Sequence, residues 1–239
     1  MASHLWWLLV GVIGFYAYDA VMLLFHNEVV LFEESDGRWT FSAGSDFELA
    51  GRHVFVPALL APHRPVLRLR WSSRVQRHDV PQLRGLRTWR AGVAATRASV
   101  VSISTMFAAL PLLLIATDSA FALLAWMLAV YLAIVLALVR TWRLRRMTSL
   151  TRKDFASLAS DALLCAPYAL NLIRKQGMRA YARFDLVPVA LALLDAGERL
   201  RLIDVIRGKL QRQMDMEDTG SDRHTQILTY LHHIEGALA

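Results

Sequence analysis

Asp19 is the residue whose type and position most strongly suggest chemistry, because it interrupts an apolar run that extends from Leu5 to Phe25. A carboxylate inside a membrane-spanning helix costs roughly 2.5 to 3.5 kcal/mol near the helix centre and less toward its end, so it needs a function or a partner. One hypothesis is that Asp19 carries protons or cations, or pairs with a basic group of another subunit. The alternative is that it reaches the water interface or accepts hydrogen bonds from hydroxyl groups of a later apolar run, which offers Ser99, Ser102, Ser104 and Thr105.

Two rows of arginine have the residue type that binds phosphate and carboxylate groups, since a guanidinium fork offers two parallel donors. The first row is Arg84, Arg87 and Arg90, and the second is Arg143, Arg145 and Arg146. Basic residues beside a membrane span attract anionic head groups at about 1 kcal/mol each. We therefore expect anionic lipids or an acidic protein partner at both rows. The chain has 27 Lys and Arg against 20 Asp and Glu, but its basic residues flank apolar runs, which argues against nucleic acid as a partner.

The histidines near the C-terminus do not have the spacing of a metal site. His232 and His233 are adjacent, and Glu235 and His224 lie near them in the sequence. Adjacent residues on a helix point about 100° apart, so the pair cannot bind one ion from a regular helix, and the His-Glu-x-x-His spacing that would do so is absent. The sequence therefore predicts no metal and no cofactor.

No motif of covalent or phosphate chemistry occurs in the sequence. There is no phosphate-binding glycine loop, no nucleophile elbow and no Cys-x-x-Cys pair, and Cys165 is the only cysteine. One set of residues has the types of an acid/base pair, although exposure to water explains it equally well. This set is His53, His63, His78 and Asp79. We therefore assign no catalytic residue, and a non-enzymatic role is the favoured expectation.

The longest apolar runs predict membrane-spanning helices. Residues 98–117 and 120–139 carry no charged side chain and are separated only by Asp118 and Ser119. At about 1.5 Å per residue each run of about 20 residues spans about 30 Å, the thickness of a hydrocarbon core. With the run from Leu5 to Phe25 as an uncleaved anchor, the sequence predicts three spans.

The basic residues predict the orientation of these spans. None precedes Arg38, eleven lie from Arg38 to Arg97, and sixteen lie from Arg140 to the C-terminus. Because positive residues concentrate on the cytoplasmic side, we expect the N-terminus outside, and residues 26–97 and the C-terminus in the cytoplasm. A multi-pass protein of the bacterial inner membrane is the corresponding location.

Between the first two spans, short runs alternate with turn residues, which is typical of β-strands. Glu28–Glu34 and Arg38–Ser42 flank Ser35-Asp36-Gly37, a hairpin connection with glycine where a positive φ is needed. The run from Val66 to Trp71 places apolar residues on one face and two arginines on the other. Four or five strands are therefore expected to form one small antiparallel sheet.

The expected fold is thus an α+β membrane protein with three transmembrane helices, a small antiparallel β module between spans 1 and 2, and a C-terminal cytoplasmic helical bundle. Helical periodicity after the last span supports the bundle, in which Ala162–Ile173 is too short to cross a membrane. The expected boundaries are 1–26 for the anchor, 27–80 for the β module, 81–97 for a basic amphipathic helix, 98–139 for the hairpin and 140–239 for the helical domain.

This layout resembles that of the proton-channel subunits that energise TonB, Tol and flagellar motor systems. Those subunits also have an outside N-terminus, a cytoplasmic insert, a two-span hairpin and a cytoplasmic tail. They are expected to have a long helical insert and polar residues on the last two spans. Here the insert has the pattern of β-strands, and Phe121 to Val139 has no hydroxyl group except that of Tyr131. The resemblance covers the layout only.

Three functions follow as hypotheses. The leading one is a non-catalytic structural or scaffolding subunit of a bacterial inner-membrane complex, whose partners are other membrane or cytoplasmic subunits in a hetero- or homo-oligomer. The second is a component of ion- or solute-coupled transport that uses Asp19. The third is a membrane enzyme acting on a phosphate-bearing lipid that is held by Arg84, Arg87 and Arg90.

Overall fold

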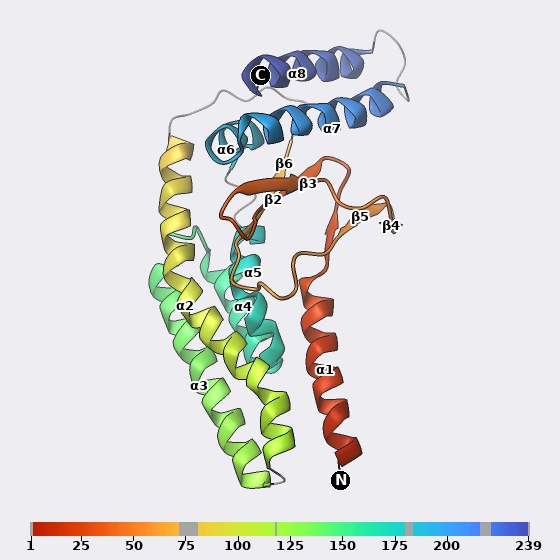
Figure 1. Ribbon diagram of the computed structural model, residues 1–239. Coiled ribbons are helices and arrows are strands. Elements are labelled where there is room, and N and C mark those ends of the chain that lie inside the picture. The colour runs from red at the N-terminus through yellow and green to blue at the C-terminus, as the bar shows by residue number, and fades with distance from the viewer. Residues whose placement is uncertain (1, 72–80, 118, 180–183, 216–220, 239) are drawn as a thin grey trace. The chain divides into compact units, whose positions relative to one another are not determined.

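The computed structural model describes residues 2–71, 81–117, 119–179, 184–215 and 221–238. The chain passes repeatedly between two compact units (Figure 1). The helical unit comprises residues 1–21, 56–65 and 88–179, and the sheet unit comprises residues 22–55, 66–87 and 180–239. The combination of small antiparallel sheets with a helical C-terminal part confirms the expected α+β class.

Two helices are long and apolar enough to cross a membrane. They are α2 (Pro81–Ala116) and α3 (Ala120–Leu144). Fewer than a quarter of the residues in the most apolar window of each helix are buried, whereas a core helix of a water-soluble protein would be mostly covered. This exposure favours a membrane location. The apolar part of α1 (Ala2–Ala20) is shorter, Leu9–Ala20, so two of the three expected spans meet the length criterion.

The first apolar run does not continue as a helix to Phe25. Helix α1 ends at Ala20, and Met22–Leu24 forms strand β1, which pairs with β5 (Arg52–Phe55). Met22 and Leu24 are buried in the sheet unit. Hydropathy alone cannot distinguish the end of a span from a buried strand, and the sequence prediction therefore placed this helix end too late.

The basic segment expected at residues 81–97 and the second span form one continuous helix, α2. No breaker lies between the two parts, and Thr96 donates a hydrogen bond to the carbonyl of Gly92 within the same helix. Further along, the rings of Phe107 in α2 and Trp126 in α3 meet edge to face with centroids 5.8 Å apart. Trp126 Nε1 also donates to the carbonyl of Met106 at 3.2 Å, so the two apolar helices are joined by both packing and a hydrogen bond.

After α3 the chain of the helical unit turns back on itself. Helix α4 (Arg152–Leu164) begins at a capping box in which Thr151 and Asp154 bond reciprocally. It ends before Cys165, because Pro167 follows and the backbone continues as the 3₁₀ helix η1 (Ala166–Asn171) and then α5 (Leu172–Arg179). Helix η1 contacts α1, α3 and α4. Residues 152–179 thus belong to the helical unit, whereas 184–238 belong to the sheet unit.

The strands form two three-stranded antiparallel sheets rather than the single sheet that the sequence predicts. One has the order β1-β5-β4, and the other has the order β3-β2-β6. The remaining strands are β2 (Glu28–Glu33), β3 (Trp39–Ser42), β4 (Glu48–Leu49) and β6 (Val66–Arg70). The expected hairpin at Gly37 connects β2 and β3. The strand β1, which lies in the run interpreted as a span, is what completes the additional sheet.

A buried acid joins the ends of β2 and β6. Glu28 is 1% exposed and is ion-paired with Arg68 and with Arg70, and its carboxylate also accepts from the Phe25 amide. Burial alone would raise the pKa of this carboxyl, but the hydrogen bonds from Arg68 and Phe25 outweigh it, so the pKa lies below its ordinary value. Ionised Glu28 therefore stabilises the fold above the pKa of the unfolded carboxyl, and this contribution is lost as pH falls through the lower, folded-state pKa.

Three helices complete the sheet unit: α6 (Leu186–Leu193), α7 (Ala196–Met214) and α8 (Asp222–Leu238). Helices α7 and α8 pack side by side (Figure 1). Three contacts place α6 and α7 against β3. The residue after α6, Leu194, forms a parallel bridge with Trp39, Glu198 accepts from the Thr40 hydroxyl at 2.7 Å, and Lys209 donates to the carbonyl of Ala43 at 3.3 Å.

Two glycines with positive φ provide a matched test of this unit. Gly44 has φ 89° and a Cβ there would lie 2.5 Å from the Cβ of His53, whereas Gly37 has φ 82° and open space around it. We expect Gly37→Ala to cost about 1 kcal/mol of unfolding free energy from backbone strain alone. Gly44→Ala should cost roughly 1 to 3 kcal/mol more because the two carbon atoms cannot both be accommodated. Thermal unfolding of the detergent-solubilised variants measures the difference, and equal losses would contradict this account.

Candidate functional site

Asp19 lies in the last turn of α1 and has partners within its own chain. Its carboxylate is 2.8 Å from Lys175 Nζ and accepts from Asn171 Nδ2 at 3.0 Å. The side chains of Asp19 and Lys175 are 13% and 9% exposed, so water does little to screen the pair. Of the four hydroxyl residues suggested by the sequence, Ser104 and Thr105 donate to carbonyls one turn earlier in α2. Asp19 is thus ion-paired with Lys175 of α5 in its own chain.

Lys175 also faces a second acid. Its Nζ donates to Asp161 of α4 at 3.3 Å, and it lies 4.7 Å from the ring centroid of Tyr168. Arg179 approaches the same Asp161 carboxylate at 3.9 Å. One ammonium group thus connects α1, α4 and α5, and its positive charge is matched by two carboxylates.

Arg174 is the most enclosed cation of this network, with 1% of its surface exposed. It donates to Tyr16 Oη at 3.1 Å, to Asn171 Oδ1 at 2.8 Å, and to the carbonyls of Ala58 and Ala61 at 2.6 and 3.2 Å. Burial lowers the pKa of this guanidinium, and Tyr16 and Asp19 oppose the effect. The group nevertheless stays charged at neutral pH, because an arginine in a protein is not deprotonated there.

The same arginine holds the segment between β5 and β6 against the helices. Two carbonyls of this segment accept from Arg174, and a third, that of Leu59, accepts from the Tyr16 hydroxyl. Leu60 between them is fully exposed, at 100%. The turn 58–61 is thus fixed by side chains on both α1 and α5. We call the set Tyr16, Asp19, Asp161, Asn171, Arg174 and Lys175 the ionic network.

The spacing of these residues along their helices explains why their side chains lie on the same helix face. Tyr16 and Asp19 are three residues apart in α1, and Asn171, Arg174 and Lys175 are spaced by three and four where η1 passes into α5. Such residues share one face of a helix. This spacing is visible in the sequence, but it does not show which two helices meet.

Next to the network, the helical unit contains an apolar cavity of about 370 Å³. Its walls come from α1, α2 and α3 and from the turn between α4 and η1. The aromatic lining residues are Phe15, Phe107, Trp126 and Tyr131, and the turn contributes Leu164 to Pro167. The α4–η1 turn therefore lies close to Phe107 of α2 and to Trp126 and Tyr131 of α3.

The two arginine rows are accessible where the sequence predicts them. Arg84, Arg87 and Arg90 are exposed along α2, and Arg143 and Arg146 are exposed at the end of α3. Arg145 instead covers the ring of Trp142, with its guanidinium carbon 3.8 Å from the ring centroid. Contact of these rows with anionic lipids stays a prediction.

The histidine hypotheses find little support in the described residues. His78 and Asp79 lie outside them. His53 approaches Glu48 at 3.6 Å in the sheet unit, whereas His63 belongs to the helical unit. Glu235 accepts from Arg207 at 2.9 Å. Within the described ranges, no group of three His, Cys, Asp or Glu side chains is arranged to hold a metal ion.

Comparison of the chain with models of protein families, with curated proteins and with solved structures finds no match. The function must therefore be inferred from the arrangement of the residues themselves.

Arg174→Lys tests whether the guanidinium geometry matters in the ionic network. One ammonium group cannot reach the four oxygens that the fork contacts, so we expect a loss of roughly 2 to 4 kcal/mol of unfolding free energy. Arg152→Lys, at an exposed position of α4, is the matched control and should unfold like the original chain. Thermal unfolding in a mild detergent measures both variants. Unchanged stability of Arg174→Lys would show that the network does not hold the helical unit together.

Proposed function

We propose that the protein is a non-catalytic structural subunit of a bacterial inner-membrane complex, with its N-terminus outside and its C-terminus in the cytoplasm. The observation that carries this proposal is the ionic network. Asp19, the only acid of the first apolar run, is engaged by Lys175 and Asn171 of the same chain. A carboxylate held in this way fixes helices to one another, which is what an anchor requires.

The arrangement of the helical unit supports α1 as a third crossing. The N-terminal end of α1 lies at the same end of the unit as the turn between α2 and α3 (Figure 1). Its 19 residues correspond to about 28 Å, close to the thickness of a hydrocarbon core. Asp19 then lies at the opposite end, where the arginines that follow α3 also lie. This placement agrees with the positive-inside rule.

The α4–η1 turn supports a membrane-embedded unit rather than a simple hairpin anchor. Trp126 and Tyr131, which face this turn across the cavity, are roughly 9 to 17 Å along α3 from its start. If α3 crosses the bilayer, the turn lies near mid-depth and α4–η1 is a re-entrant segment. Irregular backbone at such depth is tolerated where protein covers it, and Pro167, Ala169 and Leu170 of η1 are buried.

The exposed face of α1 supports association with lipid or another subunit. Trp6, Trp7, Val10, Ile13 and Tyr18 are all large and all exposed. A water-soluble surface rarely carries so continuous an apolar stripe. In the proposed complex this stripe contacts acyl chains or a partner helix, and the exposed arginines of α2 and α3 contact anionic head groups or an acidic partner.

Asp19→Asn separates the structural role from transport. The amide keeps the size of the side chain, and Lys175 keeps Asp161 as a partner, so we expect a loss of only about 1 to 2 kcal/mol of unfolding free energy. Proton flux into vesicles that contain the purified chain, followed with a pH-sensitive dye, should be the same for both proteins. Asp46→Asn, an exposed acid, is the control for the charge change. Flux through the original chain that disappears in Asp19→Asn would establish the transport function instead.

Purification of the tagged chain from its native cells tests the complex directly. After extraction in a mild detergent and size-exclusion chromatography, we expect other membrane or cytoplasmic proteins at fixed stoichiometry in the same fraction. Mass spectrometry identifies them. A monomer alone, or a homo-oligomer without other proteins, would contradict the subunit hypothesis.

A further inference from the structure

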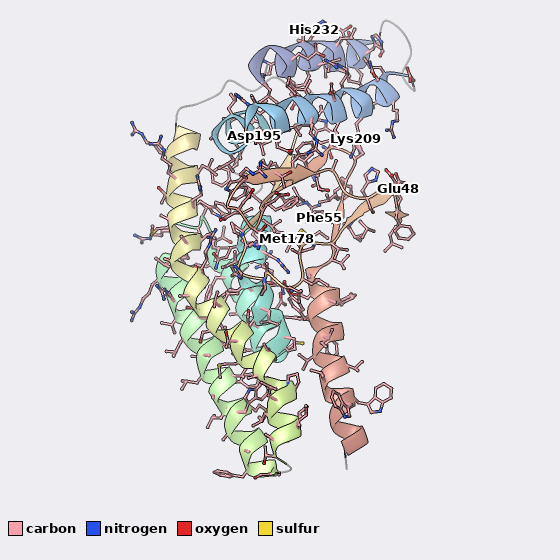
Figure 2. The ribbon with its side chains drawn as sticks, viewed as in Figure 1. Glu48, Phe55, Met178, Asp195, Lys209 and His232 are labelled. Carbon is pink, nitrogen blue, oxygen red and sulfur yellow. The ribbon has the colours of Figure 1, made fainter. Side chains whose placement is uncertain are left out.

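The sheet unit contains an open pocket of about 480 Å³ that differs in character from the apolar cavity of the helical unit. Its walls come from the β1–β2 connection, β4, β5, α7 and α8. The lining residues are His26, Glu48, His53, Lys209, Arg212, Gln213 and Arg223. Figure 2 labels two of them, Glu48 on β4 and Lys209 on α7. We call this site the basic pocket.

The lining of the basic pocket is strongly cationic. Arg212 and Arg223 carry positive charges at all ordinary pH values, Lys209 carries one when protonated, and His26 and His53 add two more groups that can be protonated. Among the lining residues that the structure describes, Glu48 is the one carboxylate, and it lies 3.6 Å from His53. Two of the cationic residues, Lys209 and Arg212, come from consecutive turns of the same helix face, whereas Arg223 comes from α8. Convergence of cations from separate elements is the arrangement that anion sites use.

Lys209 is the best positioned of these groups. Its side chain crosses from α7 to the sheet, where Nζ donates to the carbonyl of Ala43 at 3.3 Å and lies 5.8 Å from the ring centroid of Trp71. Burial and the neighbouring Arg212 lower the pKa of this ammonium, and Glu48 only partly opposes them. The hydrogen bond to Ala43 uses one of its three protons, so the group keeps donors for a ligand.

The pKa of His26 is lowered in the same way as that of Lys209. Burial lowers the pKa of its imidazole, and Lys209, His53, Arg223 and Arg70 each lower it further. These four neighbours are all cationic or become cationic on protonation. A negatively charged ligand would relieve this repulsion, and the relief would add to its binding free energy.

We propose that the basic pocket binds a small ligand that carries at least two phosphate charges. The guanidinium groups and the ammonium group supply the donors that phosphate oxygens require. The volume lies within the range of small-molecule sites and exceeds that of a single phosphate ion. The phosphate group can belong to a soluble diphosphate or to a lipid head group, and the experiment distinguishes these sources. This site is independent of the ionic network and of the proposed complex.

Lysine labelling provides the test, because the chain has only three lysines and each is in a different environment. Lys153 is exposed on α4, Lys175 is paired with Asp19 in the ionic network, and Lys209 lines the basic pocket. The detergent-solubilised full chain is acetylated with a dilute amine-reactive reagent, with and without sodium pyrophosphate, and each lysine peptide is quantified by mass spectrometry. Sodium chloride at equal ionic strength controls for general screening. We expect pyrophosphate to slow acetylation of Lys209 by roughly tenfold and to leave Lys153 unchanged.

Two substitutions that change the charge of the pocket in opposite directions test whether its positive charge binds pyrophosphate. Binding is measured by calorimetry. Lys209→Gln should weaken binding roughly tenfold because it removes a donor and a charge. Glu48→Gln should strengthen binding by roughly threefold, since it removes the negative charge of Glu48 from the lining. Lys153→Gln has the same charge change as the first variant at a distant exposed site and should bind like the original chain. An impaired fold cannot explain a gain in affinity, so Glu48→Gln keeps the proposal open to refutation if Lys209→Gln is unstable.

Vesicles distinguish the two sources of phosphate. If pyrophosphate at millimolar concentration protects Lys209, the ligand is a soluble diphosphate. If only vesicles containing phosphatidic acid protect it, and vesicles of phosphatidylcholine do not, the ligand is a lipid head group. If neither protects Lys209 beyond the sodium chloride control, or if Glu48→Gln and Lys209→Gln bind pyrophosphate like the original chain, the proposal is wrong.

Discussion

The helical unit depends on the requirement that charges withdrawn from water find partners within the protein. Arg174 is almost completely buried, and Asp19 and Lys175 are nearly so. An uncompensated charge in such a place would cost several kcal/mol, so the hydrogen bonds and ion pairs of the network are a condition for the fold. They determine which face of α1 meets α5 and where the 58–61 turn lies.

The two cations at adjacent positions of α5 meet this requirement differently. Arg174 spreads its charge over a planar group and satisfies four neutral oxygens, two of which are backbone carbonyls of one turn. Lys175 is a compact charge and lies between the carboxylates of Asp19 and Asp161. The chain is rich in arginine, yet it has a lysine where two carboxylates approach the same point. A compact ammonium group fits this geometry better than a planar guanidinium group does.

Local patterns predicted the elements that depend on neighbours in sequence. The apolar runs located α2 and α3, and glycine at position 37 located the β2–β3 hairpin. Elements that depend on tertiary contacts were missed. Strand β1 is recognisable only through its pairing with β5, some 30 residues later along the chain. Asp19 was selected from the sequence as a candidate, but its partner Asn171 is 152 residues away, and one sequence carries no record of such a pairing. The basic pocket was missed for the same reason, because its cations are scattered along the chain.

The two charged sites differ in the charges that their described side chains bring together, and this difference bears on what each does. In the ionic network, cations meet carboxylates and carbonyls, and the result is a fixed junction between helices. In the basic pocket, Lys209, Arg212 and Arg223 line one open space of ligand size, and burial together with neighbouring cations lowers the pKa values of Lys209 and His26. A fold does not gain stability from such repulsion. An anion in the pocket, as we propose, would offset the repulsion between these cations.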